Sequence, residues 1–286
     1  MNRIHPFTRF FFPLFLFFVF ASPCNSAQQQ VYSLVKSLQE KFSHAKSLEG
    51  DFSLTLHGLQ NASGPVLLKA NGRVFVLDTN LRMETIMHSI FKNGKQINMH
   101  VLFLFKDNTL WEKAKMLSSD SENFFLGKMD ANALMQAFPQ LFHGNNFLDF
   151  LNPAAGVTQL NPEKTNILGE AVLGVDKTKT VLLESPPWLL SQALNFPIQT
   201  DNPTIASIHM WVGTENGISY QTTLVDKNGK TWMRFVFTRL RVNPRLSPGL
   251  FLFSPPKDAQ VIDLTPFMIE LFRKTLQGME KGAKTP

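Results

Sequence analysis

The sequence predicts a mainly β protein with helices (α+β), built on a curved antiparallel sheet that forms an incomplete β-barrel with helices across its apolar concave face. Short runs of alternating apolar and polar residues recur along the chain, which is the pattern of strands with one buried face. Turn sequences rich in Gly, Asn and Asp separate these runs, and amphipathic segments precede, interrupt and follow them. A chain of 286 residues suits one large β domain.

The N-terminal segment has the composition of a signal peptide. Arg3 and Arg9 supply positive charge, and residues 10–21 form an apolar core that is too short to span a membrane. We expect cleavage after Ala27, which assigns residues 1–27 to the signal peptide and places the protein in the periplasm.

Cys24, the only cysteine, offers an alternative. Lipidation of its thiol would instead leave the protein anchored to the outer membrane. Pro23 directly before it disfavours this, because the lipoprotein signal requires a small residue other than proline there. If Cys24 leaves with the signal peptide, no thiol remains, which excludes disulfides and thiolate zinc sites.

A helix and a meander of strands are expected to follow. Apolar residues at helical spacing predict an amphipathic helix over residues 29–46. The turn at Asn93-Gly94 predicts a hairpin, since both positions tolerate a positive φ. Alternation predicts strands over about 51–57, 66–78, 81–91, 96–105 and 109–117.

Residues 118–165 are expected to be a helical insertion in this meander. Asp130 can cap a helix over 131–138, and Asn145 can cap another over 146–151. Such short helices are not stable alone. We therefore expect both, together with residues 186–195, to dock on the open side of the sheet as a lid.

The sheet is expected to resume over about 166–185 and to continue through three strands at 206–212, 217–225 and 231–242. Phe251 and Phe253 then fall in an expected strand that ends at Pro255. Residues 28–264 form the half-barrel domain in this scheme, and Thr265-Pro266 begins a C-terminal amphipathic helix and tail over 265–286.

Several segments together resemble the LolA/LolB superfamily of outer-membrane lipoprotein-sorting and lipoprotein carrier proteins. They are the Asp226–Lys230 turn, Asn243, the Phe251-Leu-Phe-Ser-Pro-Pro256 segment, the Val261-Ile-Asp263 ending, and Leu81-Arg-Met-Glu-Thr85. The resemblance covers about residues 31–117 and 165–264. It implies a curved sheet that wraps an apolar cavity for acyl chains.

The sequence departs from the family at one point. Typical soluble carriers place an Arg-Pro pair where this chain has Asp78-Thr79, and that Arg helps to hold the lid. The lid latch of the family is therefore not expected here, and the cargo can differ from the family's best-known one.

The resemblance and the alternation together give candidate cavity and lid residues. From composition alone, the alternating apolar residues predict an ordinary sheet core; the resemblance favours a cavity. Methionine suits a cavity of changing occupancy because its unbranched thioether adapts its shape. The candidate cavity residues are Phe52, Leu54, Leu56, Phe75, Leu77, Met83, Ile97, Met99, Val101, Phe103, Ile208, Met210, Phe235 and Phe237. The candidate lid residues are Leu134, Phe138, Phe142, Phe147, Leu148 and Trp188; permanent docking of this segment explains the same residues.

We therefore expect a monomeric periplasmic carrier that binds lipid or the acyl chains of lipoproteins, acts as their chaperone in transport toward the outer membrane, and needs no cofactor or metal. An inner-membrane exporter and an outer-membrane acceptor are its expected partners. The alternatives are a lipid- or lipoprotein-sensing regulatory domain, an acceptor anchored through Cys24, and a C-terminal helix that lies on a membrane.

Enzyme and nucleic-acid functions are not expected. None of the histidines has the spacing of a metal-binding helix, and the sequence contains no nucleophile elbow or phosphate loop. The formal net charge is +6, but the basic residues are spread along the chain rather than clustered.

Overall fold

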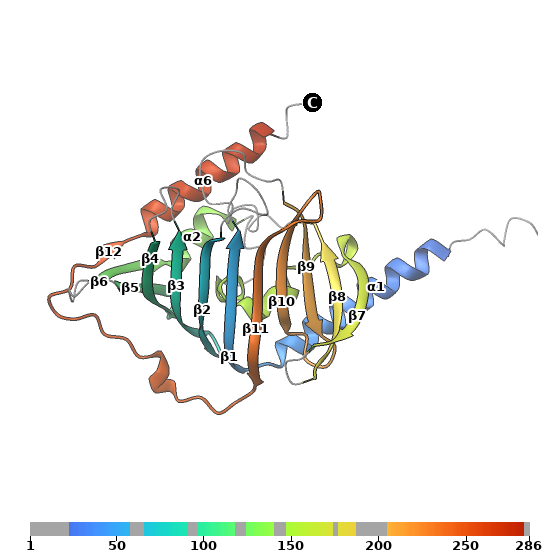
Figure 1. Ribbon diagram of the computed structural model, residues 1–286, viewed down its shortest axis with the longest axis horizontal. Coiled ribbons are helices and arrows are strands. Elements are labelled where there is room, and N and C mark those ends of the chain that lie inside the picture. Colours follow the sequence, from blue (N-terminus) through green and yellow to red (C-terminus); the bar gives the residue numbers. More distant parts are fainter. Residues whose placement is uncertain are drawn as a thin grey trace, which may run out of the picture.

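In the computed structural model of the protein, the residues described are 23–57, 66–90, 96–117, 124–139, 147–173, 177–186 and 205–282. Within these residues, 12 strands form one curved, unclosed sheet with a few helices beside it (Figure 1). The predicted fold class is confirmed. The elements are α1 (Pro23–Ser43), β1 (Ser47–His57), β2 (Val66–Leu77), β3 (Asn80–Ile90), β4 (Gln96–Lys106), β5 (Thr109–Met116), β6 (Phe124–Asp130), α2 (Ala131–Ala137), α4 (Phe147–Leu151), η1 (Pro153–Gln159), η2 (Pro162–Lys164), β7 (Asn166–Val172), β8 (Lys179–Ser185), β9 (Ile205–Gly213), β10 (Ser219–Asp226), β11 (Thr231–Val242), η3 (Pro248–Phe251), β12 (Ile262–Asp263) and α6 (Thr265–Gly282).

Two antiparallel meanders make up the sheet, and they join at its middle. The strand order is β12-β6-β5-β4-β3-β2-β1-β11-β10-β9-β8-β7, so neighbours in the sheet are mostly neighbours in the chain. At the join, β1 pairs with β11, from Leu48 opposite Val242 to Leu56 opposite Met233. Short strand β12 adds in parallel to β6 at one edge. The early and late parts of the chain therefore share one continuous surface.

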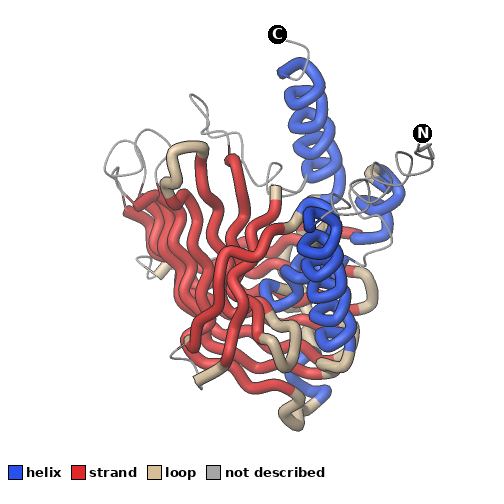
Figure 2. Tube along the Cα trace, turned by 90° about the vertical axis from the view of Figure 1, so that its right-hand side faces the viewer, coloured by secondary structure: helices blue, strands red, loops and turns tan. Residues whose placement is uncertain are grey.

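The α-helices lie on one face of the sheet (Figure 2). We call this face, which carries Phe52, the inner face. Leu38 of α1, Leu134 of α2, Phe147 of α4 and Val157 of η1 are buried in one cluster with Phe52. The predicted amphipathic helix is confirmed, although α1 begins and ends earlier than expected. None of the helices in the described part of the chain is long and apolar enough to cross a membrane.

A tight turn lets the second meander approach α1. Gly217 has a φ of +68°, and a Cβ at this position would lie 1.9 Å from the carbonyl oxygen of Leu38. Only glycine combines this backbone conformation with such a close approach. The turn between β9 and β10 therefore packs directly against the helix.

The opposite side of the sheet, the outer face, carries a second and smaller apolar cluster. Phe251 of η3 is buried there against Phe75 and Leu104. The ring centroids of Trp111 and Phe253 lie 5.4 Å apart in the same cluster. The segment after β11 thus crosses the outer face and covers part of β2, β4 and β5.

Two sequence predictions of secondary structure are wrong. Residues 124–130 form strand β6 inside the expected helical insertion, because they extend the meander beside β5. Phe251 lies in the 3₁₀ helix η3 and not in a strand, because Ser247 caps a short turn that starts at Pro248. The predicted helices after Asp130 and after Thr265 are confirmed, and the Asp130 carboxylate accepts hydrogen bonds from the amides of Asn132 and Ala133. Residues 1–22, Asn145 and 187–204 lie outside the described residues.

Candidate functional site

Strand pairing places apolar side chains in rows across the inner face. Residues directly opposite each other in antiparallel strands point to the same side of the sheet. One such row consists of Met116, Met99, Met87, Ala70, Leu54 and Phe235. The inner face is therefore apolar far beyond a single strand.

Coverage of this face is uneven. Phe237, Ile208 and Met210 have no exposed surface, and Phe52 stacks on Phe235 with ring centroids 5.2 Å apart. Further along the same face the side chains are only partly buried. We call this region the half-exposed patch: Leu54, Leu56, Met83, Met87, Met99, Phe103, Met116 and Met233.

The half-exposed patch is rich in methionine. Met87 lies opposite Met99, and Met99 lies opposite Met116, which is 41% exposed. Methionine has three rotatable bonds and a polarizable thioether, so such a surface adjusts to apolar groups of different shape. A static core has no need of partly exposed methionines on three neighbouring strands.

Most of the predicted cavity residues come together on the inner face. This group consists of Phe52, Leu54, Leu56, Met83, Ile97, Met99, Val101, Phe103, Ile208, Met210, Phe235 and Phe237. On β4, Val101 is only 2% exposed although it lies between the half-exposed Met99 and Phe103.

The prediction is wrong for Phe75 and Leu77. Both lie on the outer face, where they pack in the cluster around Phe251. Their neighbours Val74 and Val76 face inward instead. All four positions are apolar, so alternation within β2 does not distinguish its two faces.

The predicted lid helices pack firmly where the structure describes them. Leu134 and Phe138 at α2 and Phe147 and Leu148 of α4 are at most 5% exposed. The ring centroids of Phe105 and Phe147 lie 5.6 Å apart, which ties α4 to β4. Phe142 and Trp188 lie outside the described residues.

The sequence analysis did not single out Met87, Met116 and Met233. Period-two alternation within the predicted strands would have found all three, because they continue the series that contain Met83, Ala114 and Phe235. Glu112 was also missed. It shares the inner face with Leu110, and burial raises the pKa of its carboxyl.

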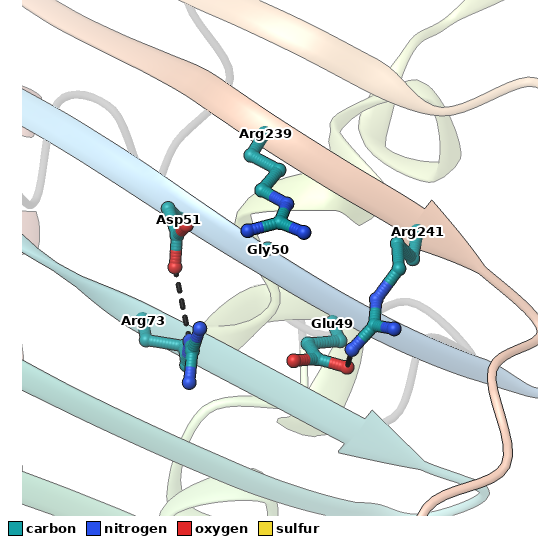
Figure 3. A pocket seen from close by; sticks show the side chains of 6 residues that line it. All are labelled: Glu49, Gly50, Asp51, Arg73, Arg239 and Arg241. Carbon is teal, nitrogen blue, oxygen red and sulfur yellow. Dashed lines mark hydrogen bonds and ion pairs between the residues drawn. The ribbon is translucent and has the colours of Figure 1, made fainter. Parts of the chain in front are cut away.

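The outer face carries a charged pocket over β2, β1 and β11 (Figure 3). Arg73 Nε donates to Asp51 Oδ1 over 3.0 Å, and Arg241 pairs with Glu49. The hydrogen bond to Asp51 raises the pKa of Arg73. Exposed ion pairs of this kind contribute little to stability and supply no reactive group. We therefore interpret this pocket as a solvated charge network.

A groove of about 450 Å³ runs along the β6 edge of the sheet. Apolar and polar residues line it: Phe124, Phe125, Leu126, Pro256, Asp258, Ala259, Gln260 and Ile262. Phe125 and Ile262 are 36% and 44% exposed. Within the described residues, no three His, Cys, Asp or Glu side chains lie close enough together to hold a metal ion.

The comparisons with known proteins give structural matches only. No protein family model matches the sequence, and no curated protein matches it. An uncharacterized conserved protein from Thermus thermophilus matches with a TM-score of 0.44 and 10% identity, over 82% of this chain and 99% of its own. A chain of the Pseudomonas aeruginosa MucA/MucB complex matches with a TM-score of 0.35 and 13% identity, over 79% of this chain and 61% of its own.

A LolA superfamily protein is among the matched structures. It is NE2245 from Nitrosomonas europaea, with a TM-score of 0.24 and 11% identity, over 78% of this chain and 97% of its own. None of these three matches exceeds a TM-score of 0.44, so the fold assignment rests on the strand order of the sheet itself.

Proposed function

We propose that the protein is a periplasmic carrier, not an enzyme, that binds lipid or the acyl chains of lipoproteins against the inner face and transfers them toward the outer membrane. The half-exposed patch supports this most directly, because it offers a partly exposed, adaptable apolar surface beside a firmly packed core. Large partly exposed apolar surfaces commonly mark binding sites.

Burial of alkyl groups against the apolar side chains of the inner face supplies the free energy of such binding. Each buried methylene contributes about 0.8 kcal/mol, so ten methylenes of a chain contribute about 8 kcal/mol before the entropic cost of association. No covalent or directed bond holds the chain. Release therefore requires only a competing apolar surface, such as a membrane or an acceptor protein.

The buried faces of α2 and α4 support a fixed floor for the cargo rather than a hinged lid. Of the predicted lid segments, residues 186–195 lie almost wholly outside the described residues, so a lid there stays a prediction. An exporter and an acceptor in the two membranes are the proposed partners.

A fluorescent fatty acid tests the proposal. The dansyl group of 11-(dansylamino)undecanoic acid brightens when it leaves water, so titration with the protein should give saturable binding that oleic acid displaces. Transfer of a fluorescent phospholipid between two populations of vesicles should be faster in the presence of the protein. A probe signal that does not saturate, or that oleic acid leaves unchanged, would contradict the proposal.

A further inference from the structure

Glu112 stands out on the inner face because of its charge. It lies opposite Phe103 on β4 and opposite Gly127 on β6, and Leu110 and Ala114 flank it on the same face of β5. From β6 through β5, β4, β3, β2 and β1 to β11, the other described residues on this face are uncharged. The carboxylate is thus the one charge in an apolar surface over these strands.

Nothing described in the structure neutralises this carboxylate. None of the ion pairs among the described residues includes Glu112. The lysines on the adjoining positions, Lys113 and Lys128, belong to the outer face, where Lys113 lies over the ring of Phe124. A carboxylate that is partly removed from water without a cation lowers stability, so its presence calls for another explanation.

Of the two sides of Glu112 within the sheet, the β4 side borders the half-exposed patch. On the β6 side, Gly127 has no side chain, but its place is filled: a Cβ there would lie 2.5 Å from Leu264 Cδ1 and 3.0 Å from Phe125 Cε1. Phe103 on the other side is a half-buried member of the half-exposed patch. A ligand that lies on the patch and contacts Phe103 would therefore also lie beside the carboxylate.

We propose that Glu112 is a specificity residue that selects cargo carrying a primary ammonium group next to its alkyl chains. The inference rests on the proposed function. An ammonium ion from the cargo would supply the missing countercharge, and its charge-assisted hydrogen bond would form inside an apolar surface, where such bonds are strong. Aminophospholipids carry this combination of groups.

Two alkyl probes that differ only in their polar end test the proposal. Dodecylamine and dodecanol compete against the dansyl fatty acid for the full-length protein, for Glu112→Gln and for Glu84→Gln. Glu84 is the matched control, because it is a strand glutamate on the outer face, paired with Arg82. We expect the protein and the Glu84 variant to bind dodecylamine about ten- to a hundredfold more tightly than dodecanol, the range of a charge-assisted bond.

The Glu112→Gln variant should lose the preference for the amine, so that it binds the two probes about equally. Equal binding of the two probes by the unchanged protein would overturn the role of Glu112 while leaving the carrier function in place. A preference that persists in Glu112→Gln would also overturn it. Failure of dodecanol and the dansyl fatty acid to bind would overturn the carrier function itself, and the role of Glu112 with it.

Discussion

Replacement of Met99 by glutamate should separate cargo binding from folding. Met99 lies in the centre of the half-exposed patch, between Met87 and Met116. Its side chain is only partly buried, so we expect Met99→Glu to lower the free energy of unfolding by about 1 kcal/mol. A bound alkyl chain would cover the new carboxylate and remove it from water.

The effect on binding should be much larger than the effect on folding. Loss of contact with two methylenes costs about 1.6 kcal/mol, and desolvation of the polar group adds about 1–3 kcal/mol. Together these lower affinity by about two orders of magnitude or more. The assay is titration of the dansyl fatty acid, with urea unfolding of the same samples followed by circular dichroism.

His100→Glu is the matched control. His100 is the next residue of β4, is exposed and points to the outer face, so its change introduces a negative charge at the same height of the same strand. It should leave the affinity for the probe unchanged. Equal binding by Met99→Glu and the unchanged protein, or an equal loss in both variants, would refute the assignment of the inner face.

Three further predictions concern the scaffold. Gly72→Ala should lower the free energy of unfolding in urea by about 1–3 kcal/mol, because the new Cβ would lie 2.2 Å from the carbonyl oxygen of Glu84. The control is Gly169→Ala, whose Cβ would meet nothing within 4 Å and which should change the free energy of unfolding by less than about 0.5 kcal/mol. Equal effects of the two changes would contradict this reasoning. Phe251→Ala should lower the free energy of unfolding by about 3–5 kcal/mol in the same assay. The folded fraction should still bind the probe, because Phe251 lies on the outer face. Weakened binding would place Phe251 at the site. Burial raises the pKa of Glu112 in the folded protein, so its carboxylate lowers the free energy of unfolding. This destabilisation is absent below the unfolded pKa of about 4.3 and complete above the folded pKa. The stability gained by Glu112→Gln over the unchanged protein should therefore grow as pH rises through that window, and a gain that is constant with pH would contradict the shift.

The positions of most strands along the chain could be predicted from the sequence, because one face of each strand is buried. In β4, Met99 and Phe103 alternate with polar His100, and the structure places them on opposite faces. Burial of a single face forces this period, so it can be read without knowing the partner strand.

The assignment of faces could not be predicted where both sides of a strand are covered. The run from Val74 to Leu77 is wholly apolar, because α-helices cover one face and Phe251 covers the other. The segment that brings Phe251 there is far away in the sequence. Only the folded chain shows that Phe75 belongs to it.

The significance of Glu112 also depended on the structure. A glutamate in a predicted strand is ordinarily assigned to the solvent face, as Glu84 is. The pairing of β5 with both β4 and β6 places Glu112 on the inner face, between Phe103 and Gly127. Period two within β5 already groups Glu112 with Leu110 and Ala114, but its neighbours on β4 and β6 come from strand pairing, which that local pattern does not show.

Native mass spectrometry of the protein, released gently from its own cell envelope, tests the central claim most directly. We expect an added mass of a lipid or an acylated lipoprotein on the unchanged protein and its loss in Met99→Glu. A bound triacylated lipoprotein would identify the protein as a sorting carrier, and a bound phospholipid would identify it as a lipid-transfer protein. A protein that is reproducibly empty, or an adduct that Met99→Glu retains in full, would contradict binding at the inner face.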